Sequence, residues 1–385
     1  MAINPHQLDL WSSQVGHLYQ SLEGEILKLI IQTIMDHGIE NIETWQVEQL
    51  RDLRMLNQEV TKLLADLTAT AEPDIREKFE QTKVGAVKEI DTIIGEETQI
   101  PTRLDNVMRG YYNQAWLGID NLVNQTLVST NYGAASAVTQ AYTKTLTRAS
   151  ALFNTGILTQ EQAVLKAVQE LAQRGIQSRF IDRGGNSWSL ERYTRTVMKS
   201  TLGNTYDEVR KERMEEAGLY TVVVTSHAGA RAECARIQGN VVDLRLPSEI
   251  PEDAHNYKSI YDPSWAAAYG EPGGHRGINC RHNHIPFIPG VNTNNQPKFD
   301  AKLNREVAQA QTRQRQLERR IVKYKKNLMV SREFGAEDIS HWEKMVLKSE
   351  EAIEKHLEEN GEYLSRNHER EEVYTPLETL LQEYK

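Results

Sequence analysis

The sequence predicts a predominantly α-helical protein with a small, glycine-rich α+β domain at its centre and a helical hairpin at its C-terminal end. Three observations lead to this fold class. Apolar residues recur at helical spacing in the first part of the chain. Short β-branched runs between glycines and prolines follow, and a heptad pattern then returns. We therefore expect a helical region over residues 1–217, an α+β domain over residues 218–297, and a helical hairpin or coiled coil over residues 298–385.

The first region shows where individual helices begin and end. Its first apolar stripe consists of Leu22, Ile26, Leu29, Ile30 and Ile34. Gly38 is expected to end that helix. Pro73 is expected to break the next one, because proline lacks a backbone donor and disfavours a helical residue before it. Farther along, Thr159 and Gln162 form a capping-box pattern, and Gly175 closes the helix that they open.

The central domain differs from the helical regions in composition. Its first segment, "LYTVVVTSH" (residues 219–227), is β-branched and aromatic and predicts a buried strand. Glycine, proline and asparagine are dense after it, and the glycines are typical of tight turns that need positive φ. "FIPGVNTNNQP" (residues 287–297) then indicates an exit linker.

The last region carries two apolar stripes on either side of a predicted turn over residues 331–338. The first stripe, which has one polar interruption, consists of Leu303, Val307, Ala310, Gln314, Leu317, Ile321, Tyr324 and Leu328. The second consists of Ile339, Trp342, Val346, Ile353 and Leu357. Both stripes follow heptad spacing, which predicts an antiparallel hairpin. A parallel coiled coil with another subunit is the rival interpretation.

Composition excludes several classes of protein. The chain has 385 residues, a net charge of −9 and two cysteines. No apolar run approaches the ~18–20 residues that a membrane span needs, and the first residues lack the basic and apolar segments of a signal peptide. Two cysteines are too few for a disulfide framework, which fits a reducing compartment. We expect a soluble, intracellular protein or a component of a larger assembly.

Histidine and cysteine gather in two stretches of the central domain, "SHAGARAEC" (residues 226–234) and "GGHRGINCRHNH" (residues 273–284). Zinc takes about four nitrogen or sulfur ligands, usually supplied as two pairs of short spacing. The first stretch supplies His227 with Cys234, and the second supplies Cys280 with His282. In an extended segment Cys280 and His282 point the same way, so both could reach one ion. The candidate metal ligands are His227, Cys234, Cys280 and His282.

Other interpretations of these residues stay open. The spacing matches no common zinc finger and lacks CxxC, so the cysteines also fit small buried groups, with the histidines bonded to loop backbone. Cys280 beside His227 or His282 has the elements of a thiol nucleophile, although "NCRH" matches no protease signature. A metal-dependent enzyme would need a carboxylate base, for which Glu233 and Asp243 are the nearest candidates. The nucleotide-binding patterns GxxxxGK[ST] and GxGxxG are absent from the sequence.

Positive charge is concentrated in residues 301–330, which hold nine lysine or arginine residues and two acidic ones. This segment therefore carries +7, and the rest of the chain sums to −16. Phosphate contacts by such a helix would make DNA binding sensitive to salt. We favour a solvated face or a face that docks on an acidic partner, because no aromatic stacking platform accompanies the charge. The candidate DNA or partner contacts are Arg313, Arg315, Arg319, Arg320, Lys323, Lys325 and Lys326.

Three elements of the central domain resemble the tailed-phage minor capsid protein 2 family, which is related to the Mu F-like and SPP1-type head morphogenesis proteins. They are "SHAGAR" (residues 226–231), "QG" (residues 238–239) and the stretch from "YG" to "PFIPGV" (residues 269–291), which contains "NCRH". The basic segment "QTRQRQLERRIVKYKKNL" (residues 311–328) is also similar to the family's downstream helix. In relatives, histidine is common at the position of Cys234, an exchange that a metal ligand tolerates.

The resemblance implies a structural, non-enzymatic virion protein that is made beside the portal protein. Such proteins sit at or near the portal vertex in few copies, with roles in head assembly or DNA delivery. The implied partners are the portal protein, other capsid components and further copies of the chain, and assembly takes place in the host cytoplasm. Arg276 stands where relatives often carry cysteine. Only a helical hairpin follows residue 297, so an appended enzyme domain is not expected, and zinc is the one cofactor under consideration.

Overall fold

A computed structural model describes residues 5–37, 42–95, 101–128, 136–278 and 280–384. This part of the chain is predominantly helical with small antiparallel sheets, which confirms the predicted fold class. None of its helices is long and apolar enough to cross a membrane. The α-helices are α1 (Pro5–His37), α2 (Ile42–Ile94), α3 (Thr102–Ile119), α4 (Gln125–Val128), α5 (Ala137–Phe153), α6 (Gln160–Arg174), α7 (Leu190–Glu216), α8 (Ala232–Ala235), α9 (Ala301–Glu333), α10 (Ile339–Asn360) and α11 (Leu377–Glu383). The strands are β1 (Gln177–Ile181), β2 (Ser187–Ser189), β3 (Thr221–Val224), β4 (Val241–Asp243) and β5 (His284–Pro286).

The predicted boundaries of α6 are confirmed. The Thr159 side chain accepts a hydrogen bond from the Gln162 N–H at 3.3 Å, and the Gln162 side chain accepts one from the Thr159 N–H at 3.1 Å. These two bonds satisfy donors that the first helical turn leaves free. Gly175 ends the helix with φ +69°, which a glycine adopts without steric cost. The predicted end of α1 at Gly38 lies just outside the described residues.

The predicted break at Pro73 is wrong, because α2 continues through this residue. Ala71 and Ile75 on either side of it are fully buried. Burial of the flanking apolar residues contributes more than the single backbone hydrogen bond that a proline removes, so packing overrides the local preference.

The chain folds into two compact units. One comprises Met1–Ser13, Ile75–Ala115 and Thr196–Arg313, and the other comprises Gln14–Asp74, Trp116–Arg195 and Gln314–Lys385. The boundaries fall inside helices, so α1, α2, α3, α7 and α9 each contribute residues to both units. Each unit is thus built from segments that are distant in the sequence, and the whole of residues 218–297, which we call the central module, lies in the first unit.

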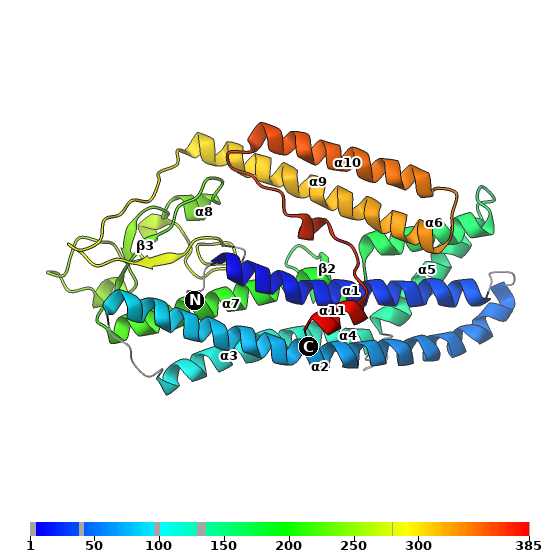
Figure 1. Cartoon of the computed structure of the whole chain (residues 1–385), viewed down its shortest axis with the longest axis horizontal. Coiled ribbons are helices and arrows are strands. Elements are labelled where there is room, and N and C mark those ends of the chain that lie inside the picture. Colours follow the sequence, from blue (N-terminus) through cyan, green and yellow to red (C-terminus); the bar gives the residue numbers. More distant parts are fainter. Residues whose placement is uncertain (1–4, 38–41, 96–100, 129–135, 279, 385) are drawn as a thin grey trace. The chain divides into compact units, whose positions relative to one another are not determined.

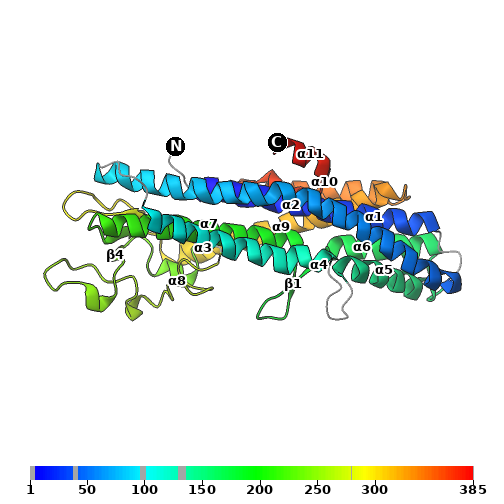
Figure 2. The same cartoon turned by 90° about the horizontal axis from the view of Figure 1, so that it is seen from below.

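The central module is organised around a three-stranded antiparallel sheet of order β4-β3-β5. All four residues of β3 are buried, which confirms the predicted buried strand. Val222 and Val224 of this strand share an apolar core with Ile90 of α2 and Met214 of α7. In the same unit α3 lies alongside α7 (Figure 2). Helices therefore cover the sheet that positions the candidate site.

The predicted exit linker is held against the central module. The Gln296 side chain accepts a hydrogen bond from the Ser226 N–H at 2.8 Å, and the Asn294 side-chain amide donates one to the Gly239 carbonyl at 2.9 Å. The segment contains no helix or strand after β5, as its composition predicts. Its polar side chains tie it to the loops around β3.

In the second unit, α9 and α10 form the predicted helical hairpin (Figure 1). Lys325 lies 3.3 Å from Glu350, and Arg332 lies 2.8 Å from Glu343, which defines an antiparallel pairing. The seam between the helices buries apolar side chains from both stripes. The residues of this cluster are Leu317, Ile321 and Ile353, with Ala352 and Leu357 partly buried beside them.

Candidate functional site

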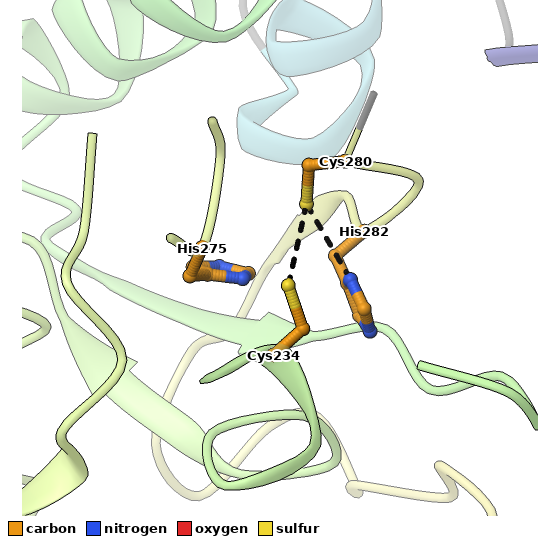
Figure 3. Close-up of side chains that lie close together, drawn as sticks. All are labelled: Cys234, His275, Cys280 and His282. Carbon is orange, nitrogen blue, oxygen red and sulfur yellow. Dashed lines mark hydrogen bonds between the residues drawn. The ribbon is translucent and has the colours of Figure 1, made fainter. Parts of the chain in front are cut away.

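Two segments of the central module bring thiol and imidazole groups together beside the sheet. The single helical turn α8 presents Cys234, and the glycine-rich loop before β5 presents the other members. Figure 3 shows the four side chains converging from these two segments. We call this group the Cys/His cluster; it consists of Cys234, His275, Cys280 and His282.

The ligand atoms of the Cys/His cluster all lie within 4.8 Å of one another. The two sulfur atoms are 3.9 Å apart, and Cys280 Sγ is 3.5 Å from His282 Nδ1. Cys234, His275 and His282 are at most 1% exposed. The donors are therefore packed around one small, largely dry volume.

The structure brings together three of the four predicted ligands and adds His275 to them. His227 is the predicted ligand that stands apart from the cluster. Its ring stacks on His282 with centroids 4.4 Å apart, and its Nδ1 lies 3.1 Å from the Ala228 carbonyl oxygen. His275 belongs to the quoted stretch "GGHRGINCRHNH", but its spacing of five residues from Cys280 does not form a short ligand pair. Pairing by spacing therefore did not select His275, because the intervening chain is folded into tight turns.

Two glycines make those turns possible. A Cβ at Gly274 would lie 1.8 Å from the Ala268 carbonyl oxygen, and a Cβ at Gly277 would lie 2.0 Å from the Glu271 carbonyl oxygen. Both distances are far below van der Waals contact, so only glycine lets the backbone pass at these points. The first close approach places His275 beside Ala267, whose carbonyl accepts the His275 N–H at 2.8 Å. The sequence's turn prediction is thus confirmed, with steric contact rather than positive φ as the reason at these two positions.

The side chain of Arg276 connects the same loop to α7. Its guanidinium pairs with Asp207 of α7, donates to the Gly203 carbonyl at 3.1 Å, and also donates to the His282 carbonyl. Its backbone has φ +60°, a left-handed conformation that side chains other than glycine rarely adopt. In this chain Arg276 fixes the position of His282 through its backbone.

The histidines of the cluster each have a hydrogen-bond partner behind them. His282 Nε2 lies 2.9 Å from the Gln238 side-chain oxygen, and His275 Nε2 lies 2.9 Å from His284 Nε2. His275 Nδ1 is buried and has no hydrogen-bond partner. Burial lowers the pKa of His275 and lowers that of His284 well below its usual value, so both rings are neutral at physiological pH. Neutral imidazole is the form that binds a metal.

The two thiols form a coupled pair. A hydrogen bond with Cys234 lowers the pKa of Cys280, and the neighbouring imidazoles of His275 and His282 lower it further. The same bond and burial raise the pKa of Cys234. Of the two sulfurs, Cys280 is therefore the one that loses its proton more readily. A cation placed among these atoms would take the place of the shared proton.

The proposed carboxylate bases of a metal-dependent enzyme are occupied elsewhere or lie outside the cluster. Asp243 on β4 is fully buried, accepts a hydrogen bond from the Arg245 guanidinium at 2.6 Å and lies 3.0 Å from His255. Burial opposes ionisation of Asp243, but the hydrogen bonds from Arg245 prevail and lower its pKa. Glu233 precedes Cys234 on α8 and is not one of the clustered groups. The arrangement is suited to holding a metal ion with four protein ligands rather than to activating water.

The predicted basic contacts on α9 are partly neutralised within the second unit. Arg315 lies 2.5 Å from Glu318, Lys325 lies 3.3 Å from Glu350, and Lys326 lies 3.2 Å from Glu23. These pairs remove much of the charge that a phosphate backbone would meet.

The other four basic residues differ in exposure. Arg313, Arg319 and Lys323 are exposed, and Arg320 is half-buried. Among the described residues, Arg319 and Lys323 have no acidic group within ion-pair distance. Three of the seven basic residues are therefore ion-paired, and Arg319 and Lys323 are exposed charges without such a partner among the described residues.

Comparison with known proteins points to one kind of relative. A family model described as phage minor capsid protein 2 matches residues 3–358. The chain is 29% identical over 370 residues to the "Structural protein" of Lactococcus phage LL-H, which covers 93% of this chain and 98% of that relative. It is 30% identical over 118 residues to the "Structural protein" of Lactococcus phage mv4, covering 30% of this chain and 92% of that one. No solved structure matches the chain.

Proposed function

Because the chain belongs to the phage minor capsid protein 2 family, we propose that it is a non-enzymatic structural protein of a tailed-phage virion that joins the head at the portal vertex. Such a protein assembles in the host cytoplasm and then becomes part of the capsid. The observation that carries the proposal is the extent of the family match, which runs from α1 into α10 and includes the central module. The match therefore concerns the whole architecture rather than one motif.

The chemistry of the central module supports a structural role. The Cys/His cluster offers four ligands to a single ion. A catalytic zinc keeps one coordination position open for water or substrate, and four protein ligands would occupy that position. The buried carboxylate of Asp243 is held by Arg245 and His255 and is not free to act as a general base.

The long helices are the surfaces that we assign to assembly. Portal rings are symmetric, and a few copies of a helical protein can repeat one contact around such a ring. On α10 the large apolar side chain of Leu347 is 57% exposed, and Arg319 and Lys323 on α9 are accessible charges. These groups offer both apolar area and charge to a partner, which can be the portal protein or another copy of the chain.

Co-expression with the portal protein of the same phage tests the proposal. We expect the chain to co-purify with the assembled portal ring over a range of salt concentrations, and to be absent from a portal ring of an unrelated phage used as a matched control. Quantitative mass spectrometry of purified virions should find the chain in far fewer copies than the major capsid protein. Absence from virions would refute the structural role, whereas presence without portal binding would refute only the location.

The DNA-binding alternative makes a different prediction. If the stripe on α9 contacted phosphates, the apparent affinity for duplex DNA would fall steeply with salt and would fall again in an Arg319→Glu, Lys323→Glu variant. We expect neither effect, since the pairs with Glu318, Glu350 and Glu23 already neutralise three of the basic residues of this helix. An electrophoretic mobility shift at two salt concentrations distinguishes the cases.

A further inference from the structure

We propose that the Cys/His cluster binds one zinc ion as a structural site, with both histidines coordinating through Nδ1. The proposal is independent of where the protein sits in a virion, since it rests on the geometry of four side chains in one unit. The ligand set differs from the one that sequence spacing favours, because His275 replaces His227.

Two of the donor–donor distances match the edges of a tetrahedron around zinc, and all four donors lie within 4.8 Å of one another. Zinc binds sulfur at about 2.3 Å and imidazole nitrogen at about 2.0–2.1 Å, so neighbouring ligands in a tetrahedron are separated by about 3.8 Å for two sulfurs and about 3.6 Å for sulfur and nitrogen. Here the two sulfurs are 3.9 Å apart, and Cys280 Sγ is 3.5 Å from His282 Nδ1. Little movement of these side chains is needed to close around an ion.

Hydrogen bonding determines which ring nitrogen of His282 is unprotonated and directed toward the cluster. The Gln238 side-chain atom that meets His282 Nε2 also meets the backbone N–H of His227 at 3.2 Å. A backbone N–H can only donate, so that atom is the amide oxygen, and an oxygen can only accept. The neutral His282 ring therefore carries its proton on Nε2 and presents an unprotonated Nδ1 to Cys280.

His275 has the same arrangement with a different partner. Its Nε2 lies 2.9 Å from Nε2 of His284, and one of these two nitrogens must carry the shared proton. When His275 donates it, His275 Nδ1 keeps its lone pair. That atom is fully buried and has no hydrogen-bond partner among the described residues, which is costly unless another group fills the position. A metal ion held between the four donors is such a group.

Gln238 and His284 therefore act as positioning residues behind the metal ligands. Zinc-bound histidines usually donate their second ring N–H to a carbonyl, carboxylate or other acceptor, which fixes the ring and its tautomer. Gln238 lies in the turn after α8, and His284 begins β5 next to the central strand. The sheet thus aligns one ligand, and the turn after α8 aligns another.

The donor types select zinc and a structural role. Two thiolates with two neutral imidazoles form a tetrahedral set that favours zinc over the oxygen-preferring cations. Four protein ligands complete that set without a water. Cys280 also lines a cavity together with Lys199, Tyr206 and Arg276, which gives an ion a route to the site.

The ion would tie together two segments that have little other regular structure. α8 is a single turn, and the described residues of the loop before β5, 266–278 and 280–283, contain no helix or strand. Small modules with short strands commonly need such a cross-link, because their own core buries little apolar surface. Zinc binding would therefore order the turn and the loop together.

Metal content of the full-length, untagged protein tests the proposal, because a histidine tag would itself bind zinc. After dialysis against buffer without chelator, we expect about one zinc per chain by inductively coupled plasma mass spectrometry, with zinc absent from Cys234→Ser and His275→Ala. His227→Ala is the matched control, and it should keep its zinc since His227 only stacks on the site. Wild-type protein without zinc would overturn the proposal. Loss of zinc from His227→Ala with retention in His275→Ala would overturn the assigned ligands.

Cobalt substitution of the wild-type protein avoids the risk that a variant fails to fold. Protein stripped of zinc and loaded with Co(II) should show the visible bands of a tetrahedral ion and near-ultraviolet charge transfer from two thiolates. Spectra of an octahedral ion, or the absence of sulfur charge transfer, would refute the site. A competition titration with a chromophoric chelator then tests the positioning residues, and Gln238→Ala should weaken zinc affinity about 10–100-fold while stoichiometry is kept. Unchanged affinity would remove Gln238 from its assigned role.

Discussion

The central module and the α9–α10 hairpin are stabilised in opposite ways. The module has three strands of three or four residues each, and its loops are fixed by individual contacts such as Arg276 to the His282 carbonyl and Gln238 to His282. The hairpin has two long helices joined by a seam in which Leu317, Ile321 and Ile353 are buried. The module therefore depends on a few groups at defined positions, whereas the hairpin depends on apolar area.

This difference predicts how each region responds to mutation. When a hydrogen bond to one carbonyl or one ring nitrogen is lost, no other group takes its place, and the buried polar atom is left without a partner. An apolar seam spreads its free energy over many atoms, so surface charges on the same helices contribute little. Substitutions that change shape at a turn should therefore act on the module, and substitutions that remove buried volume should act on the hairpin.

Removal of buried volume in the seam gives the largest expected effect. Ile321 is 0% exposed, so Ile321→Ala should destabilise the hairpin by about 2–5 kcal/mol through lost burial and the cavity that remains. Hydrogen exchange of the α9 and α10 amides measures it. Leu347→Ala on the exposed face of α10 is the control, with an expected change within about 0.5 kcal/mol because this side chain is 57% exposed. Equal effects of the two variants would contradict the seam.

Adding one carbon to a turn tests the module. Gly274→Ala places a Cβ 1.8 Å from the Ala268 carbonyl oxygen, so the backbone must shift, at an expected cost of about 1–3 kcal/mol. Gly273→Ala, one residue earlier, adds the same atom where nothing lies within 4 Å, and we expect it to be nearly neutral. Urea unfolding of the two variants by near-ultraviolet circular dichroism measures the difference. A harmless Gly274→Ala would show that the loop does not require the close approach.

Much of the fold could be predicted from the sequence, because local rules decide it. The capping box at Thr159, the end of α6 at Gly175 and the two heptad stripes depend on residues close together in the chain. The predicted break at Pro73 was wrong because tertiary packing, rather than a local rule, decides the structure there. Its outcome depends on packing around Ala71 and Ile75, which no local pattern reveals.

The candidate site could be predicted only in part. Residue type and the spacing of Cys280 and His282 identified three of the clustered side chains. The place of the fourth, His275, in the cluster depends on tight turns at positions that only glycine allows. These turns bring His275 close to Cys280, five residues later in the chain. The contacts of Gln238 with His282 and of His284 with His275 could not be predicted, because such a hydrogen bond leaves no spacing pattern in the sequence.

The buried carboxylate of Asp243 gives a pH-dependent test of the module, with a smaller effect. Its pKa is lowered, because hydrogen bonds from Arg245 outweigh the opposing effect of burial, and the nearby His255 adds to the shift. The unfolded chain therefore takes up a proton at higher pH than the folded one. The stabilisation is fully present above about pH 4 and is lost as the pH falls through the folded value.

Asp243→Asn should thus cost on the order of 1–2 kcal/mol at pH 7, and the difference from wild type should shrink as the pH falls below about 4. Urea midpoints between pH 3 and pH 7 give both numbers. Glu233→Gln on α8 serves as the control, since the carboxylate there has no place in the cluster. A difference that grows toward low pH would contradict the assigned direction.

The smallest effect on stability is expected from removing an ion pair between the two helices of the hairpin. Lys325 and Glu350 lie 3.3 Å apart, and each is about one-third exposed. Solvent screens such a pair, so a double-mutant cycle with Lys325→Ala and Glu350→Ala should give a coupling of about 0.2–1 kcal/mol that declines further at high salt. A coupling as large as the effect of Ile321→Ala would show that ion pairs, rather than the apolar seam, join α9 to α10. The contrast between hairpin and module would then have to be drawn on charge instead of buried area.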